Sequence, residues 1–206
     1  MTNPVAEPST RDRIVEAADA LFYQQGFEKT SFADIADAVQ LSRGNFYYHF
    51  KTKDAILAAV IALRAARTQS MLEAWARNAT TPMARLQCFA EMLIQNRQEI
   101  QRYGCPVGTL CAELAKLNHP AQGGASMIFG QFREWLRAQF ESMGQGEQAD
   151  TLAMHLLSRS QGIAALAHAF HDESFIRREV DLIGTWLVSL APKAVVAQRL
   201  RRRNTP

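Results

Sequence analysis

Apolar residues recur at helical spacing along almost the whole chain, and this periodicity constrains the fold more than any other feature. In the first such segment, Ile14, Ala17, Ala18, Leu21 and Phe22 follow the i, i+3, i+4 pattern that lines one face of a helix. No convincing run of alternating β-branched residues, the pattern of a half-buried strand, interrupts this periodicity. The chain is therefore predicted to be all-α.

The composition is that of a folded, soluble chain. Of 206 residues, 48% are apolar and 21% charged, which excludes low-complexity and collagen-like classes. Three cysteines are an odd number in a chain of this length, so they argue against a secreted disulfide scaffold and for a reducing compartment. We expect neither a signal peptide nor a membrane-spanning helix, because the first ten residues lack an apolar core and the apolar stretches carry charges. A cytoplasmic location follows.

Two helices are expected before residue 40. Thr10 is a candidate N-cap for the first helix and Gly26 a candidate stop. Ser31 and Asp34 form a capping-box pattern at the start of a short second helix. Farther on, Thr52 is expected to cap a long helix that reaches about Asn78.

A third short helix follows a tight turn, which gives the layout of a helix-turn-helix, whose second helix lies in the major groove of DNA. Ser42 can cap this helix, and Phe46 and Phe50, four residues apart, are expected to point inward. On the outward face, Arg43 can bond to guanine and Asn45 to adenine. Further candidates are Gly44, for close backbone approach, and the phosphate-reaching side chains Tyr47, Tyr48, His49 and Lys53. The alternative is that both tyrosines are ordinary half-buried aromatics and the cations a solvated face.

Charge is distributed unevenly. Residues 41–53 hold three cations and no carboxylate, interleaved with aromatic side chains, which favours nucleic-acid binding. Residues 192–206 carry five basic residues and no acid, and we expect this tail to be disordered. The tail could add phosphate contacts, although terminal charge runs are usually solvated.

The segments TSFADIA (30–36) and LSRGNFYYHFKTKD (41–54) resemble the DNA-binding domain of the TetR family of bacterial repressors. The resemblance spans about Arg11 to Leu57, and the run YYHFKTK is similar to the family signature nearly position for position. It implies a bacterial, nucleoid-associated regulator that binds double-stranded DNA. The residues that it implies at the DNA are Ser31, Ser42, Arg43, Gly44, Asn45, Tyr47, Tyr48, His49 and Lys53.

The resemblance also implies a division into a DNA-binding domain (1–54), a helical effector-binding and dimerisation domain (55–191) and the basic tail (192–206). The second domain is expected to contain one helix from Pro82 to Tyr103 and others that begin near Pro106, Pro120, Glu147 and Ser174. A homodimer with two recognition helices one DNA turn apart would read a palindromic operator.

The last two helices suit a dimer interface, because they combine an apolar stripe with small residues that allow close approach. The candidate interface residues are Ser160, Ala164, Ala167, Val180, Ile183, Trp186 and Leu187. The alternative is that both helices belong to the core of a single chain.

A small apolar effector is expected to bind between residues 61 and 140, where flexible and aromatic apolar side chains gather. The candidates are Trp75, Phe89, Met92, Met127, Phe132 and Trp135, each of which could equally be core.

Cys105 is a second candidate for sensing. Pro106 suits the first position of a helix, so Cys105 occupies the N-cap, where the helix dipole and Arg102 favour a nucleophilic thiolate. The segment 104–114 also resembles the corresponding segment of TetR-family repressors that respond to electrophiles. However, no lysine lies between Lys116 and Lys193 to form the cysteine-lysine linkage of one such sensor. The alternatives are a buried, inert Cys105 and a reversibly bound apolar effector.

No constellation of side chains supports catalysis, a metal or a cofactor. His168 and His171 beside two acids, or Cys105 with His119, have no spacing typical of a catalytic or metal site. The chain is predicted not to be an enzyme. An effector-independent, architectural DNA-binding protein of the TetR type remains the alternative to a repressor.

Overall fold

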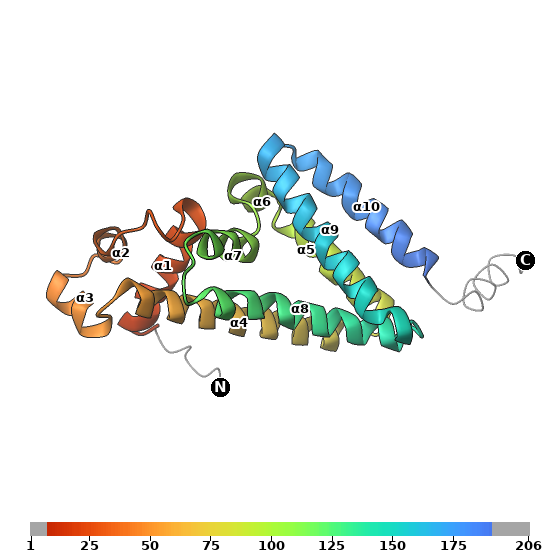
Figure 1. Cartoon of the computed structure of the whole chain (residues 1–206), viewed down its shortest axis with the longest axis horizontal. Helices are drawn as coiled ribbons and strands as arrows, with labels where there is room; N and C mark the ends of the chain where they lie inside the picture. Colours follow the sequence, from red (N-terminus) through yellow and green to blue (C-terminus); the bar gives the residue numbers. More distant parts are fainter. Residues whose placement is uncertain (1–7, 191–206) are drawn as a thin grey trace, which may run out of the picture. The chain divides into compact units, whose positions relative to one another are not determined.

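The computed structural model describes residues 8–190, and these form helices joined by short turns. The helices are α1 (Thr10–Gln25), α2 (Phe32–Ala38), α3 (Arg43–His49), α4 (Lys53–Asn78), α5 (Pro82–Gln95), α6 (Arg97–Tyr103), α7 (Pro106–Lys116), α8 (Gln122–Ser142), the 3-10 turn η1 (Gly146–Gln148), α9 (Ala149–Phe170) and α10 (Glu173–Ser189) (Figure 1). No strand occurs within this described range, so the predicted all-α class is confirmed. The basic tail lies outside the described residues.

The helices expected near Pro106, Pro120, Glu147 and Ser174 begin within two residues of these positions, whereas two other features differ from the sequence expectation. The first helix is capped by Ser9 and not by Thr10, because the Ser9 side chain accepts from the Asp12 N–H and completes a capping box. The single helix expected from Pro82 to Tyr103 is two helices, with Asn96 between them in a non-helical conformation. The capping box of Ser31 and Asp34 is confirmed.

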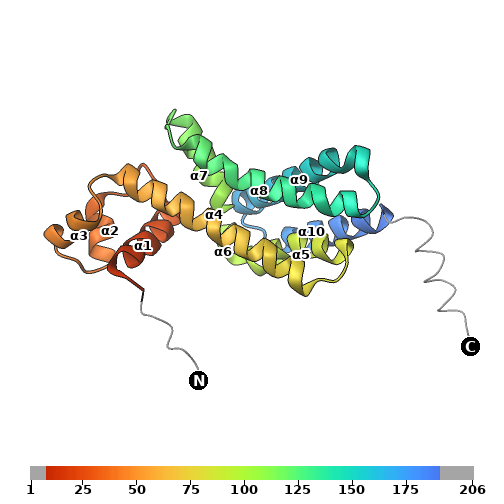
Figure 2. The ribbon, with the colours of Figure 1, turned by 90° about the horizontal axis from the view of Figure 1, so that it is seen from below.

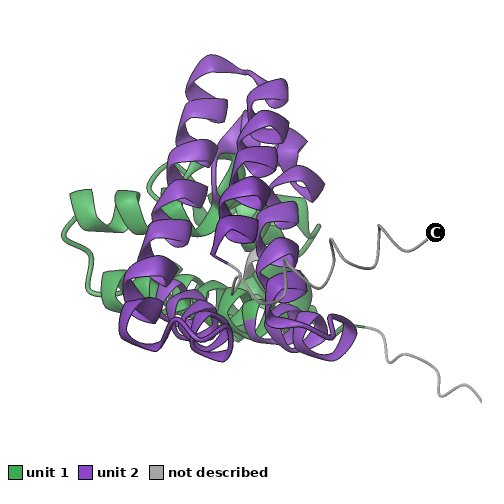
Figure 3. Cartoon of the chain, turned by 90° about the vertical axis from the view of Figure 1, so that its right-hand side faces the viewer, with its two compact units in different colours: residues 1–68, 106–128 green, residues 69–105, 129–206 purple. Residues whose placement is uncertain are grey.

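The chain divides into two compact units by its internal contacts (Figure 3). Unit 1 comprises residues 1–68 and 106–128, and unit 2 comprises residues 69–105 and 129–206. Both α4 and α8 are shared between the units. This division by contacts does not address the functional ranges 1–54 and 55–191, which stay a prediction.

In unit 1, α1, α2 and α3 lie beside the N-terminal part of α4 (Figure 1, Figure 2). Their core contains Phe46 and Phe50, 1% and 4% exposed, as their spacing predicts. Helix α7 completes this core with Leu110 and Leu114. Unit 1 therefore joins two segments that are distant in the sequence.

The turn between α2 and α3 has a left-handed residue that is not glycine. Gln40 has a φ of 55°, and the next amide, of Leu41, donates to the carbonyl of Ala36 at 3.1 Å. This hydrogen bond closes the C-terminal end of α2 in the way of a Schellman motif. The backbone reversal is therefore obtained at a cost of about 1 kcal/mol relative to glycine.

A buried arginine connects three helices of unit 1. The Arg64 side chain on α4 is 6% exposed, and its Nε donates to Asp19 Oδ1 on α1 at 2.6 Å. The same guanidinium donates to the Pro106 carbonyl at the start of α7 at 2.5 Å. Removal of one partner of such a buried ion pair usually costs about 3–5 kcal/mol, because the remaining charge is left without compensation.

Helix α4 has the length and the apolar composition that a membrane-spanning helix needs, although no such helix is expected from the sequence. In the structure its first turns bury Ile56, Leu57 and Val60 in the core of unit 1. The first turns of α4 thus use its apolar side chains in the core of unit 1.

In unit 2, α10 packs against α5 and α9. Trp186 on α10 is half-buried, with its ring 5.0 Å from that of His155 and 6.1 Å from that of Phe140. The remaining apolar stripe of α10, which includes Ile183 and Leu187, is buried.

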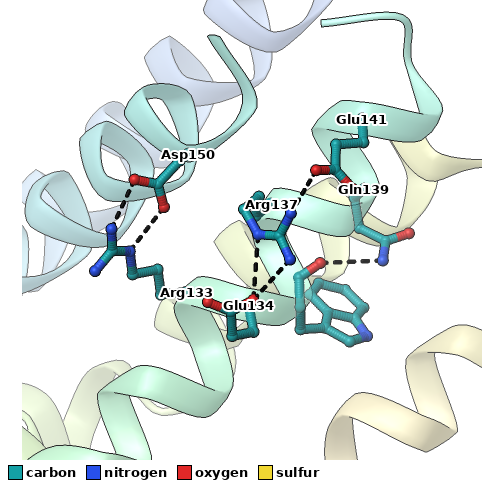
Figure 4. A network of polar contacts seen from close by, with 7 residues as sticks. Arg133, Glu134, Arg137, Gln139, Glu141 and Asp150 are labelled. Atoms are coloured by element: carbon teal, nitrogen blue, oxygen red, sulfur yellow. Dashed lines mark hydrogen bonds and ion pairs between the residues drawn. The ribbon is translucent and has the colours of Figure 1, made fainter. Parts of the chain in front are cut away.

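Figure 4 shows an exposed network of ion pairs along α8. Arg133 donates two hydrogen bonds to Asp150, which raise the pKa of Arg133 and lower that of Asp150. Arg137 pairs with Glu134 and Glu141 on its own helix. Because these groups are exposed, the pairs orient side chains more than they stabilise the fold.

Asp172 is the N-cap of α10 and provides a pH test of the fold. Its carboxylate accepts hydrogen bonds from Ser174 Oγ at 2.6 Å, from the Phe175 N–H at 3.0 Å and from Arg178 at 3.0 Å. The bond from Ser174, followed by those from Phe175 and Arg178, lowers the pKa of Asp172 from 3.8 to about 2. The folded state therefore favours the ionised form.

We expect Asp172→Asn to unfold at lower denaturant than the wild type at pH 7, because the amide keeps the cap oxygen and loses the charge. Because the folded pKa is depressed, the stabilisation is complete above 3.8 and disappears as the pH falls towards about 2. Urea unfolding of both proteins across this range measures the difference. A difference that stays constant with pH would contradict the assignment.

Candidate nucleic-acid interface

Helix α3 exposes one polar face and buries the other. Tyr48 is 78% and Tyr47 47% exposed, and Gly44 and Asn45 are exposed on the preceding turn. His49 is half-buried, and the side chain of Arg43 lies outside the described part of the chain. The structure thus brings together most of the residues that the sequence places at DNA.

Each of the two exposed tyrosines contacts the aromatic ring of another residue. Tyr47 stacks on Phe32 of α2, with ring centroids 5.5 Å apart and an angle of 23° between the planes. Tyr48 meets the His49 ring edge-on at 5.2 Å. Tyr47 is therefore partly a packing residue, whereas Tyr48 projects most of its surface into solvent.

Gly44 has no role in the packing of the chain. A Cβ atom at this position would meet nothing within 4 Å, and the helix around it would gain from alanine. The absent side chain leaves backbone open on the exposed face of α3. A partner can approach the helix closely at this point.

Both candidate serines act as helix caps. Ser31 Oγ accepts from the Asp34 N–H at 3.1 Å, and Ser42 Oγ accepts from the Asn45 N–H at 3.4 Å. The reciprocal bond from the Ser31 N–H to Asp34 lowers the pKa of the Asp34 carboxyl. These caps fix the beginnings of α2 and α3.

Lys53 holds the loop between α1 and α2. Its Nζ donates to the carbonyls of Phe27 at 2.9 Å, Glu28 at 3.2 Å and Thr30 at 3.1 Å, and lies 4.3 Å from the Phe27 ring centroid. An ammonium group has three protons, so these bonds use all of them. A contact between Lys53 and a DNA phosphate stays a prediction and requires this arrangement to change.

Sequence reasoning missed Glu113, which holds the same loop from α7. Its carboxylate accepts from the Phe27 N–H and from the Glu28 N–H, both at 2.9 Å. The available signal was a single acidic residue within an otherwise apolar turn of α7, which does not identify its partners. We call Lys53, Glu113 and the loop 26–30 the loop clamp.

The candidate effector residues are divided by the structure. In unit 2, Trp75 lies against Trp135 and Phe89 against Phe132, each pair with centroids 5.6 Å apart. Met127 is different, because it is 73% exposed and belongs to unit 1. Its side chain therefore lies mostly in solvent in this structure.

The remaining two sensing candidates, Met92 and Cys105, are half-buried. Cys105 directly precedes the first residue of α7, as expected from the following proline. Burial and the nearby Glu91 raise the pKa of Cys88, which favours the unreactive thiol at that position.

The candidate dimer residues lie mostly inside a single chain. Side-chain exposure is 0–7% for Ser160, Ala164, Ala167, Val180, Ile183 and Leu187, and Trp186 is half-buried. These side chains have little surface left for a second copy, because α5, α9 and α10 cover one another's apolar stripes.

A different stripe of α9 is exposed. It contains Met154, Ser158, Gly162, Leu166 and Phe170, spaced four apart, and we call it the outer stripe of α9. Phe170 is 73% and Leu166 45% exposed. Between Asp150 and Asp172, the sequence contains one charged residue, Arg159, which pairs with Glu179 at 3.0 Å. An apolar stripe without charges is typical of a surface that meets a partner.

Two family models match this chain. Residues 14–60 match that of the bacterial regulatory proteins of the tetR family. Residues 82–180 match that of the C-terminal domain of LmrA/YxaF-like transcriptional regulators. The first match contains α2, α3 and the beginning of α4, where the polar face described above lies.

Similar proteins and structures agree with these matches. A relative from Lactococcus lactis, an HTH-type transcriptional regulator in the lacX 3′ region, is 26% identical and covers 86% of this chain and 92% of its own. The HTH-type transcriptional repressor DhaR from Mycobacterium sp. is 24% identical, with 74% of each chain covered. The crystal structure of a TetR transcriptional regulator from Legionella pneumophila superposes with a TM-score of 0.77 at 25% identity, covering 86% of this chain and 97% of that one. The chain belongs to the TetR family of bacterial transcriptional regulators and has its DNA-binding helix-turn-helix near the N-terminus.

Proposed function

We propose that this regulator is a homodimeric repressor that leaves a palindromic operator when a small apolar or electrophilic effector binds. The observation that carries the proposal is the exposed face of α3, where Gly44, Asn45, Tyr47 and Tyr48 lie opposite a buried Phe46. In a helix-turn-helix this face enters the major groove. The proposal places the protein in the bacterial cytoplasm, at the nucleoid, without catalytic activity.

The roles at DNA follow from side-chain chemistry. Arg43 suits guanine and Asn45 suits adenine, whereas Tyr47, Tyr48 and His49 suit phosphates. Ser31 and Ser42 cap the two helices, and the N–H groups at the starts of α2 and α4 are further candidates for phosphate contacts.

We assign the dimer surface to the outer stripe of α9 and the exposed apolar side chains of α10, in place of the buried residues that sequence periodicity favoured. Leu182 and Val188 on α10 are 55% and 54% exposed. A Cβ at Gly162 or Gly184 would meet nothing within 4 Å, which leaves room for close approach by a second helix. Exposed apolar side chains and small residues of this kind suit a two-fold interface.

For the effector we retain two chemistries. The aromatic pairs of unit 2 and the half-buried Met92 are the candidate apolar surface for a reversibly bound molecule. Cys105 offers a covalent site for an electrophile at the start of α7. Both would act by changing the separation of the two recognition helices.

The DNA-reading role of α3 is tested by Gly44→Ala. The new methyl group meets nothing within 4 Å in the chain, so we expect the free energy of unfolding to stay equal or to rise by up to about 1 kcal/mol. The same methyl group stands between α3 and the groove, so operator affinity should fall by about tenfold or more, equivalent to about 1.4 kcal/mol. The operator is first selected from randomised duplex DNA by the purified wild type, and affinity is measured by fluorescence anisotropy at a fixed salt concentration.

Gly130→Ala on α8 is the matched control, because a Cβ there also meets nothing within 4 Å. It makes the same chemical change in a helix and should leave operator affinity unaltered. If the wild type, Gly44→Ala and Gly130→Ala bound the operator with equal affinity, this result would contradict the assignment of α3 to the major groove. Selection of a sequence without an inverted repeat would contradict the palindromic operator.

The dimer surface is tested by Leu166→Glu. Two-fold symmetry places the new carboxylate in the interface twice, where it is desolvated without a partner, so the dimer should dissociate. Sedimentation equilibrium at micromolar concentration measures the mass. Met127→Glu, at a position 73% exposed on α8, is the control and should stay dimeric. A Leu166→Glu protein that keeps the dimer mass would place the interface elsewhere.

Covalent sensing is tested with N-ethylmaleimide. The thiolate of Cys105 would add to the reagent and release the operator, so Cys105→Ser should bind DNA normally and no longer respond. Cys88→Ser is the control and should respond like the wild type, because the raised pKa of Cys88 keeps that thiol protonated. Release that persists in Cys105→Ser would transfer sensing to another residue. If N-ethylmaleimide did not release the wild type from the operator, covalent sensing would be excluded and the reversibly bound apolar effector would remain.

A further inference from the structure

The loop between α1 and α2 is held on both sides of its backbone by opposite charges. On one side the Glu113 carboxylate accepts the N–H groups of Phe27 and Glu28, each at 2.9 Å. On the other side Lys53 donates to the carbonyls of the same two residues and of Thr30. Hydrogen bonds to ionised groups are about twice as strong as neutral ones, so the two side chains fix the loop firmly.

The carboxylate of Glu113 reaches the backbone because Gly26 has no side chain. A Cβ at Gly26 would lie 3.0 Å from Oε1 of Glu113. Gly26 also has a φ of 93° and, as the C-cap of α1, donates its N–H to the Phe22 carbonyl at 3.1 Å. One glycine therefore ends α1 and makes space for the acid from α7.

The clamped loop leads directly to the DNA-reading helices. Thr30 is completely buried and is followed by Ser31, the N-cap of α2. The far end of α2 is tied back to α1, where Arg13 donates to the Val39 carbonyl at 3.1 Å. A displacement of the loop would thus carry α2, and with it α3, away from its place on α1.

Helix α7 is itself anchored to the same helices. Arg64 joins the Pro106 carbonyl, at the first residue of α7, to Asp19 on α1. Seven residues later, Glu113 contacts the loop that follows α1. Two successive turns of α7 are fixed to the N-terminal helices, the first by a buried cation and the second by an anion.

We propose that Glu113 is a positioning residue for operator binding. It holds the loop 26–30 against α7 and thereby sets the orientation in which α3 is presented to the groove. The inference rests on the proposed DNA-reading role of α3 and goes beyond it, because Glu113 lies on a helix outside the helix-turn-helix and its carboxylate holds the backbone of the loop 26–30.

The sign of the effect separates this role from simple electrostatics. A carboxylate in a DNA-binding protein repels phosphates, so removal of its charge should strengthen binding if the charge is all that matters. A positioning role predicts the opposite result. Non-specific binding depends on phosphate contacts and much less on the orientation of α3, so it should change little.

The experiment compares Glu113→Gln with the wild type as full-length chains on the selected operator and on randomised duplex DNA. The glutamine amide has one acceptor oxygen, so its NH₂ group faces one of the two backbone N–H donors. We expect operator affinity to fall by about tenfold and affinity for random DNA to stay within about twofold. Glu16→Gln is the control, because it removes an equal charge from an exposed pair with Arg67 in the same unit, and it should bind at least as tightly as the wild type.

Two further measurements keep the test decisive. Native-state hydrogen exchange of the Phe27 and Glu28 amides should quicken in Glu113→Gln while the amides of α10 stay protected. If Glu113→Gln does not fold, Glu113→Asp takes its place in the test. This variant keeps the charge and withdraws the carboxylate by one methylene, so it should also lose operator affinity. Wild-type affinity in either folded variant would overturn the inference, as would equal losses on both DNAs. A wild type without any specific operator would instead overturn the function on which the inference rests.

Discussion

The guanidinium of Arg64 imposes the strictest condition on unit 1. At 6% exposure it cannot be solvated, so the fold must supply Asp19 from α1 and the Pro106 carbonyl from α7 at the same time. Satisfying one buried charge therefore fixes the mutual arrangement of three helices. The loop clamp fixes the loop 26–30 in the same way, with one charged side chain from α4 and one from α7, and we propose that it positions the helices that follow.

Much of the N-terminal fold is predictable because its signals are local. The capping box of Ser31, the inward phenylalanines of α3 and the long helix to Asn78 depend on residues within a few turns of one another. Glu113 and Phe27 are 86 positions apart, and no periodicity links a carboxylate to backbone amides so far away. The displaced cap at Ser9 and the break at Asn96 are differences of one residue, which depend on single hydrogen bonds and dihedral angles.

The C-terminal helices show what an apolar stripe does not reveal. The spacing of Val180, Ile183 and Leu187 correctly indicates a buried face, but burial by the same chain and burial by a second copy produce the same pattern. The structure assigns that face to packing within the chain. Residues such as Gly162 and Leu166, which periodicity alone would pass over, become conspicuous once the helices have been packed and an uncharged apolar stripe remains exposed.

The discontinuity of unit 1 also has a consequence for synthesis on the ribosome. Its first segment ends at residue 68, whereas its second runs from 106 to 128, so sixty residues (69–128) must still be made before the unit is complete. At about 5–20 residues per second this takes roughly 3–12 s. During that interval the helix-turn-helix exists without Glu113 and without the Pro106 carbonyl that accepts a hydrogen bond from Arg64. A nascent or truncated chain that stops at residue 68 thus contains every side chain proposed to face DNA and none of the α7 contacts proposed to orient them.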